Sequence, residues 1–160
     1  MKTIDIELAI MNHFNFSQKL IVPNITNFLL SFECDMFILS NSGYATGFEI
    51  KVSKNDLKND LNKRHILGLG KQKNGKTGLE YYFGKFKYFN YAVPELLQEE
   101  AFKQIPSFCG LYIAEEKTLQ QVRQPKKLFN YKFTDKERYD VARLGAMRIY
   151  NLKRKIKKLS

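Results

Sequence analysis

The 160-residue sequence contains no tryptophan, only two cysteines and only two histidines. Two thiols cannot form a disulfide framework, so we expect Cys34 and Cys109 to be reduced and buried, as in a cytoplasmic protein. Neither His13 nor His65 has a cysteine nearby in the sequence, so the residues offer no ligand set for a structural zinc ion. The fold must therefore be stabilised by its hydrophobic core.

Long apolar runs are also missing. No segment approaches the roughly 18 uncharged apolar residues that a membrane helix needs. Asp5 and Glu7 stand where a signal peptide would have its apolar centre, so we expect neither secretion nor a membrane partner. With 44% hydrophobic and 14% aromatic residues, the chain is long enough to bury a core. We expect one domain over residues 1–160.

Acidic residues are scarce relative to basic ones. Asp and Glu total 16 against 27 Lys and Arg, a net charge of +11. Residues 51–91 carry a net +7 and residues 120–160 a net +10, whereas residues 1–50 and 92–119 carry −3 each. Two basic blocks favour one positively charged face, which is typical of proteins that contact a nucleic-acid backbone. Charge also serves solubility, so it predicts DNA as a partner without indicating any chemistry.

Hydrophobic periodicity predicts an α/β fold. Thr134 and Glu137 form a capping-box pattern, which predicts the start of a long basic C-terminal helix. The expected order before it is a helix over residues 3–15, a three-stranded meander over 24–53, a helix over 54–65, a mobile basic loop over 66–80, a buried strand over 81–93, a short helix over 96–104, a strand over 109–116 and a basic connector over 118–128.

The third strand of the predicted meander carries the residues best suited to chemistry. Its alternation places Glu49 and Lys51 on the face opposite the apolar residues, and the preceding strand offers Asp35. Carboxylate oxygens suit Mg²⁺ or Mn²⁺, and the backbone carbonyl of Ile50 could supply a further oxygen. The ammonium of Lys51 could position a water molecule and stabilise charge on a phosphate.

Asp35, followed after thirteen residues by Glu49-Ile50-Lys51, resembles the PD-(D/E)XK nuclease superfamily. Residues 30–128 resemble MmcB-like DNA-repair proteins and related phage-encoded proteins in sequence and in the order of their segments, most specifically over residues 47–63. The resemblance implies a restriction-endonuclease-like core and a Mg²⁺- or Mn²⁺-dependent DNA endonuclease, acting in DNA repair or phage DNA processing. It makes Asp35, Glu49 and the Ile50 carbonyl metal ligands and Lys51 the catalytic lysine.

Four further acidic residues bear on this assignment. The resemblance makes Glu7 an accessory acid, and Glu33 lies two residues from Asp35, so it could be a ligand instead or as well. Cys34 stands where the family motif has proline. Asp56 and Asp60 share a helix face that we expect to point into solvent.

Several alternatives remain open. Glu49 and Lys51 could be an ordinary ion pair on a solvated strand face. His65 is expected at the surface, where a histidine at the end of a basic helix usually lies. A noncatalytic DNA-binding accessory protein with this fold would show the same charge pattern. The oligomeric state is open as well, a homodimer included.

Residues 70–77 (GKQKNGKT) match the P-loop expression GxxxxGK[ST], which would indicate an NTPase. A P-loop needs a buried strand before it and a helix after it, and neither flank has that pattern. We therefore interpret the segment as a flexible basic loop. The lysines expected to contact DNA phosphates there and on the following strand are Lys71, Lys73, Lys76, Lys85 and Lys87.

Overall fold

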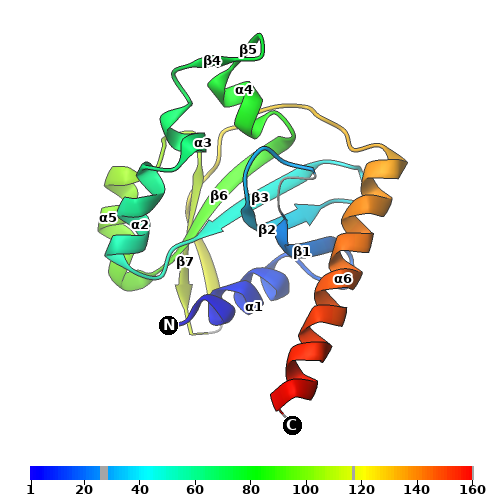
Figure 1. The fold of residues 1–160 in the computed structure, drawn as a ribbon. Coiled ribbons are helices and arrows are strands. Elements are labelled where there is room, and N and C mark those ends of the chain that lie inside the picture. The colour runs from blue at the N-terminus through cyan, green and yellow to red at the C-terminus, as the bar shows by residue number, and fades with distance from the viewer. Residues whose placement is uncertain (26–28, 117, 160) are drawn as a thin grey trace.

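A mixed six-stranded sheet forms the centre of the computed structural model, which describes residues 1–25, 29–116 and 118–159. The strand order is β1-β2-β3-β6-β7-β8 (Figure 1). β3, β6 and β7 run parallel, and the other neighbouring pairs are antiparallel. The strands are β1 (Leu20–Ile25), β2 (Cys34–Leu39), β3 (Ala45–Ile50), β6 (Phe86–Pro94), β7 (Gly110–Glu115) and β8 (Thr118–Arg123).

The predicted antiparallel meander is confirmed, with its first strand shifted. β1 begins at Leu20 rather than at residue 24 and contains Pro23. Proline is accepted there because β1 is an edge strand, where an absent N–H leaves no neighbour unpaired. Of the residues expected to complete this strand, 26–28 lie outside the described residues. The turn between β2 and β3 places Gly43 at a φ of 87°.

Helices cover both faces of the sheet. α1 (Thr3–His13) buries Ile6 and Ile10 against one face, in a core that includes Met36 and Phe48. A larger, aromatic-rich core lies on the other face. The helices that contribute to it are α2 (Lys54–Leu61), α4 (Gly78–Phe83), the 3-10 turn η1 (Glu95–Leu97) with α5 (Gln98–Gln104), and α6 (Asp135–Leu159).

The segment expected to be a loop and then a strand differs from its prediction. Residues 78–83 form α4, and β6 starts only at Phe86. Thr77 caps the helix, because its Oγ1 accepts the N–H of Glu80 at 3.2 Å. The aromatic run of residues 81–83 has no helical or strand periodicity of its own, so this cap determines the element.

The P-loop-like residues fold as a hairpin rather than as a phosphate-binding loop. β4 (Gln72–Lys73) pairs with β5 (Lys76–Thr77), and the turn holds Asn74 and Gly75 at φ values of 52° and 72°. Asn-Gly at these φ values is the sequence that a two-residue hairpin turn favours. Contrary to the prediction, a helix, α4, does follow residues 70–77, but no buried strand enters them, so the geometry of a P-loop is not formed.

Two further elements refine the predicted order. The expected helix over residues 54–65 is divided into α2 and a separate turn of helix, α3 (Arg64–Leu67). The expected connector after residue 118 begins as β8, which pairs with β7. Among the described helices, none combines the length and the apolar composition that a membrane crossing needs.

The basic C-terminal helix is confirmed, and its first turn has the predicted capping box. Thr134 N–H donates to Glu137 Oε2 at 3.0 Å, and Glu137 N–H donates to Thr134 Oγ1 at 3.3 Å. The helix packs on β1 and buries Val141, and its end projects beyond the sheet (Figure 1). The α/β fold expected from the sequence is therefore present.

Candidate active site

Glu49 and Lys51 lie at the end of β3, where α2 covers them. The Lys51 ammonium donates to Glu49 Oε2 at 2.7 Å, and the two residues are 2% and 0% exposed. The alternative of a solvated Glu–Lys pair is therefore wrong. Burial of two charges is expensive unless they are paired and hydrogen-bonded, so this pair is a specific feature of the fold.

Asp60 of α2 joins the pair and completes a buried charge cluster. Its Oδ1 lies 3.0 Å from Lys51 Nζ and 2.9 Å from Lys63 Nζ. Its Oδ2 accepts the hydroxyl of Tyr91, on β6, at 2.5 Å. Lys63 also reaches Glu49 Oε2 at 3.4 Å. Two carboxylates and two ammonium groups thus meet between β3, β6 and α2.

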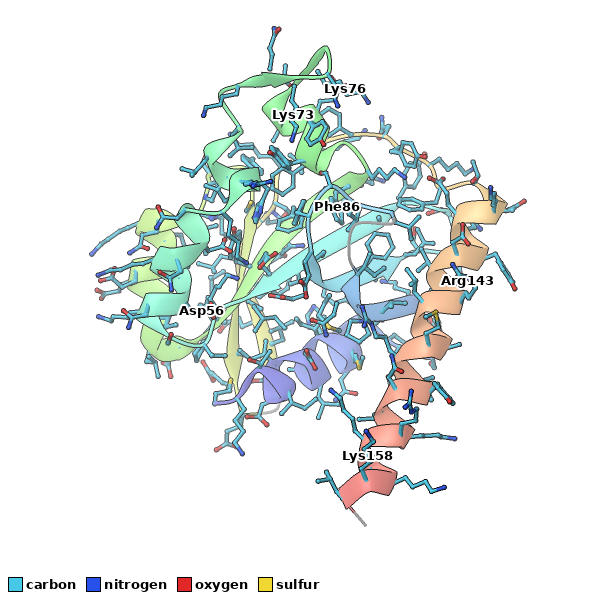
Figure 2. The ribbon with its side chains drawn as sticks, in the orientation of Figure 1. Asp56, Lys73, Lys76, Phe86, Arg143 and Lys158 are labelled. Atoms are coloured by element: carbon cyan, nitrogen blue, oxygen red, sulfur yellow. The ribbon has the colours of Figure 1, made fainter. Side chains whose placement is uncertain are left out.

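The expectation that Asp60 points into solvent is wrong, and the helix period explains why. Asp60 follows Leu57 by three residues, so both lie on the face of α2 that packs on the sheet. Asp56 lies elsewhere, near the start of α2, where its N–H donates to the capping residue Ser53 (Figure 2). The spacing from Leu57 was a signal that could have identified Asp60.

His65 was expected at the surface and is instead buried. The short helix α3 turns it inward, where its ring stacks on Phe32 with centroids 4.3 Å apart. Its Nε2 has no hydrogen-bond partner among the described residues. No local sequence signal indicates this position, because it depends on a contact with a distant segment.

Glu49, Asp60 and His65 each bring one possible ligand atom within 4.8 Å of the other two. Glu49 Oε1 is likewise buried without a hydrogen-bond partner in the described part of the chain. Buried polar atoms in native proteins almost always have partners, so these two atoms are the natural candidates for ligands to a bound ion. Carboxylate oxygen and imidazole nitrogen are both metal ligands. This cluster could hold a metal ion.

Burial controls protonation in the cluster. It raises the pKa of Glu49 to about 7, assisted by the nearby charge of Asp35, and it lowers the pKa of His65 to about 4. Burial alone would lower the pKa of Lys51, but the adjacent Glu49 and Asp60 carboxylates raise it overall. Burial opposes ionisation of Asp60 too, yet Lys51 outweighs it and lowers its pKa. His65 is thus neutral at pH 7, with a lone pair free to bind a cation.

Asp35 lies on β2 beside the cluster. Its Oδ2 accepts the N–H of Ile50 at 2.7 Å, which ties β2 to the end of β3. The structure therefore brings Asp35 near Glu49 and Lys51. Glu7 is half-buried on α1, and its pKa is raised by burial and then by the charge of Asp35. These residues make the site more acidic than the three-residue metal cluster alone.

A cavity of about 500 Å³ opens at this site. Asp35 and His65 line it together with basic residues of the α2–α3 junction and of the hairpin. Glu33, at the rim, is exposed. The lining residues are Ser31, Phe32, Glu33, Asp35, Lys63, Arg64, His65, Lys73 and Tyr82. An anionic ligand can therefore approach acidic groups through a basic entrance.

Of the five lysines predicted to contact DNA, Lys73 lines this cavity. Lys73 and Lys76 extend from the hairpin at the top of the view in Figure 2. The side chain of Lys85 instead pairs with Glu137 of α6 at 2.8 Å. Lys63 and Arg64 also line the cavity, and they were not singled out within the predicted helix over residues 54–65. The four predicted lysines outside this cavity are Lys71, Lys76, Lys85 and Lys87.

The fold and the cluster define an α/β protein with a buried acidic centre that could hold a metal ion. Comparison with solved structures finds SPO1766, a protein of unknown function from Silicibacter pomeroyi. The match has a TM-score of 0.63 and 15% sequence identity, and it covers 98% of this chain and 92% of that one. At this identity the likeness shows a shared fold alone. No family model and no curated protein matches the sequence. The mixed sheet and acidic cluster are compatible with the PD-(D/E)XK resemblance.

Proposed function

We propose that this protein is a metal-dependent endonuclease that hydrolyses DNA phosphodiester bonds at the site formed by Asp35, Glu49 and Lys51. One observation carries the proposal. Glu49 Oε1 and His65 Nε2 are buried without a hydrogen-bond partner among the described residues, close to the paired Lys51 and to a cavity lined by Lys63, Arg64 and Lys73. A core selected only for stability would pair or remove such atoms.

The residues present fit a divalent cation. Glu49, Asp60 and His65 would hold it, with Asp35 close by, and an imidazole in the set favours Mn²⁺ over Mg²⁺. When bound, such an ion acts as a Lewis acid that activates water and stabilises charge on phosphate oxygens. The role of the Ile50 carbonyl as a metal ligand stays a prediction from the resemblance. The contact between Ile50 and Asp35 is made by the Ile50 N–H, which donates to Asp35 Oδ2.

The other side chains have separate roles. Lys51 is held in its charged form by Glu49 and Asp60, so its ammonium can stabilise negative charge developing on a scissile phosphate. Glu49, with a pKa of about 7, can gain or lose a proton at neutral pH. At the entrance, Lys63 and Arg64 can neutralise phosphates of the bound strand.

A noncatalytic DNA-binding accessory protein is the second candidate, and one observation favours it. The Lys51 ammonium already lies between Glu49 Oε2 and Asp60 Oδ1, so a cation is not needed to neutralise those two oxygens. In that case the basic entrance would bind DNA and the buried cluster would only stabilise the fold. This candidate requires neither a metal ion nor Asp35.

A cleavage assay separates the two. The protein is incubated at low salt with supercoiled plasmid and with single-stranded circles, in Mg²⁺, Mn²⁺ or EDTA. We compare the parent with Asp35→Asn and Glu49→Gln, and with Glu99→Gln as a control, because Glu99 is exposed on α5 and does not line the cavity; circular dichroism verifies folding. Metal-dependent cleavage by the parent and by Glu99→Gln, lost in the other two, supports the nuclease. DNA that is retarded equally by all four proteins and never cleaved supports the accessory protein.

A further inference from the structure

We infer that the strand entering this site is unpaired: the substrate is single-stranded DNA or a single-stranded tail, held along a groove of lysine and tyrosine side chains. The inference deepens the proposed nuclease activity and rests on it for the chemistry. It is carried by a second cavity next to the first, by the side chains between them and by the apolar residues of that second cavity.

The groove consists of two cavities that share Ser31 and Tyr82. The first, of about 500 Å³, contains Asp35 and His65. The second, of about 260 Å³, is lined by Tyr81 and Tyr131, with Lys76, Lys85 and one acidic residue, Glu80. A strand with its phosphate at Asp35 would therefore have neighbouring nucleotides placed beside α4 and the hairpin.

Lysines and tyrosines alternate along this groove. Lys73 Nζ lies 4.6 Å from the ring centroid of Tyr81 and 5.8 Å from that of Tyr82. Lys85 Nζ lies 5.2 Å from the ring centroid of Tyr131. Proteins that bind single strands combine basic groups that follow the backbone with aromatic rings on which the bases stack.

The apolar residues of the second cavity argue against a duplex. Leu29, Leu30 and Phe129 line it together with the tyrosines, beside the charged residues Lys76, Glu80 and Lys85. In a duplex the base faces are stacked on one another and the phosphates are outermost, so the apolar and aromatic side chains would meet only charged backbone. Unpaired bases have free faces to place there.

Binding without catalysis tests the inference directly. Fluorescence anisotropy in EDTA compares a labelled twelve-nucleotide thymidine oligomer with a labelled hairpin duplex that carries the same number of phosphates. Tyr81→Leu and Lys73→Gln change the groove. Lys103→Gln is the matched lysine control, because Lys103 is exposed on α5 and lines neither cavity, and Tyr139→Leu is the matched control for the tyrosine.

We expect the parent to bind the single strand at least tenfold more tightly than the duplex. Tyr81→Leu should weaken single-strand binding roughly tenfold, since one stacked base contributes about 1–3 kcal/mol. Lys73→Gln should weaken it and reduce its salt dependence, while both controls stay within about twofold of the parent. Equal or tighter binding of the duplex, or an unchanged affinity in Tyr81→Leu, would overturn the inference.

Cleavage in Mn²⁺ distinguishes failure of the inference from failure of the proposed function. Metal-dependent cleavage of relaxed duplex circles as fast as single-stranded circles supports the nuclease and overturns the single-strand inference. Selective single-strand binding with no cleavage in any metal supports the groove and overturns the nuclease. Selective cleavage of single-stranded circles, weakened in Tyr81→Leu but not in Tyr139→Leu, supports both.

Discussion

Replacing Lys51 by methionine tests whether the buried charges form a cluster that needs a cation. The substitution keeps most of the side-chain volume and removes the ammonium group. Glu49 and Asp60 would then face each other, with Lys63 as the remaining cation at 3.4 Å and 2.9 Å. The Lys63 side chain is 45% exposed, so its compensation is reduced by solvent screening.

The expected loss is large. Removing one partner of a buried ion pair costs about 3–5 kcal/mol, because the other charge stays buried and uncompensated. Because Lys63 still partly compensates the two carboxylates, we expect the loss in free energy of unfolding to be near the lower end of that range. For a domain of this size each kcal/mol corresponds to about 2–4 °C, so the melting temperature at pH 7 in EDTA should fall by roughly 6–12 °C.

Metal binding provides the second part of the assay. In Lys51→Met a divalent cation no longer competes with an ammonium group, so Mn²⁺ at about a hundredfold excess over its dissociation constant should restore about 2.7 kcal/mol. The parent should gain less at the same concentration. Urea unfolding followed by circular dichroism, in EDTA and in Mn²⁺, measures both quantities. Lys54→Met is the control, since Lys54 is 63% exposed and lies 3.9 Å from Glu100, and its change should stay within about 0.5 kcal/mol.

Two results would refute the reasoning. A loss below about 1 kcal/mol for Lys51→Met in EDTA, similar to that of Lys54→Met, would mean that the cluster is solvated rather than buried. An equal response of Lys51→Met and Lys54→Met to Mn²⁺ would mean that the ion binds elsewhere or not at all.

Four further predictions concern pH and packing. Burial raises the pKa of Glu49 from 4.5 to about 7, so ionisation of Glu49 lowers the free energy of unfolding as pH rises through that window. Glu49→Gln should remove this pH dependence, as measured by urea titrations in EDTA. Burial lowers the pKa of His65 from 6.5 to about 4, so the free energy of unfolding falls as pH falls through that window. His65→Gln should remove this pH dependence in the same titrations. A Cβ on Gly47 would lie 2.6 Å and 2.7 Å from two buried phenylalanine rings, so Gly47→Ala should cost about 1–3 kcal/mol in urea unfolding, whereas Gly70→Ala, with nothing within 4 Å, should be near neutral. Lys85 and Tyr131 lower the pKa of Glu137 to about 2 against the effect of burial, so Glu137→Gln should lose stability at pH 7, and the parent's advantage should disappear as pH falls from 4.5 toward 2 in thermal melts.

Local sequence pattern was sufficient for most of the fold. The alternation of β3 and the capping box at Thr134 each determine an element through contacts within a few residues, and both are present. α4 was not predicted, because its aromatic run also suits a buried strand. The contact that favours a helix there is the Thr77 cap on the N–H of Glu80, which is as local as the capping box at Thr134. The start of β1 was missed because proline in a strand depends on which strand is at the edge, and that is a property of the whole sheet.

The candidate site was predictable only in part. Glu49 and Lys51 share a face because strands have a period of two, and Asp35 followed from the motif. Asp60 could have been found from its spacing to Leu57 on α2. His65 could not, since its burial arises from stacking on Phe32, a contact between segments that no local period relates.

The charges explain why this site should respond to both protons and metal ions. Asp35, Glu49 and Asp60 are three acids in or beside the cluster, and Lys51 and Lys63 supply two cations. The three acids carry one more negative charge than the two lysines balance, and Glu49, although its Oε2 contacts both lysines, is the fully buried acid whose pKa burial raises to about 7. Either a proton or a metal ion can balance that charge, and each excludes the other at Glu49. Metal affinity should therefore increase as pH rises through neutrality. Fewer protons then compete for Glu49, and Glu49 Oε1 and His65 Nε2, which have no partner in the described part of the chain, are available to the ion.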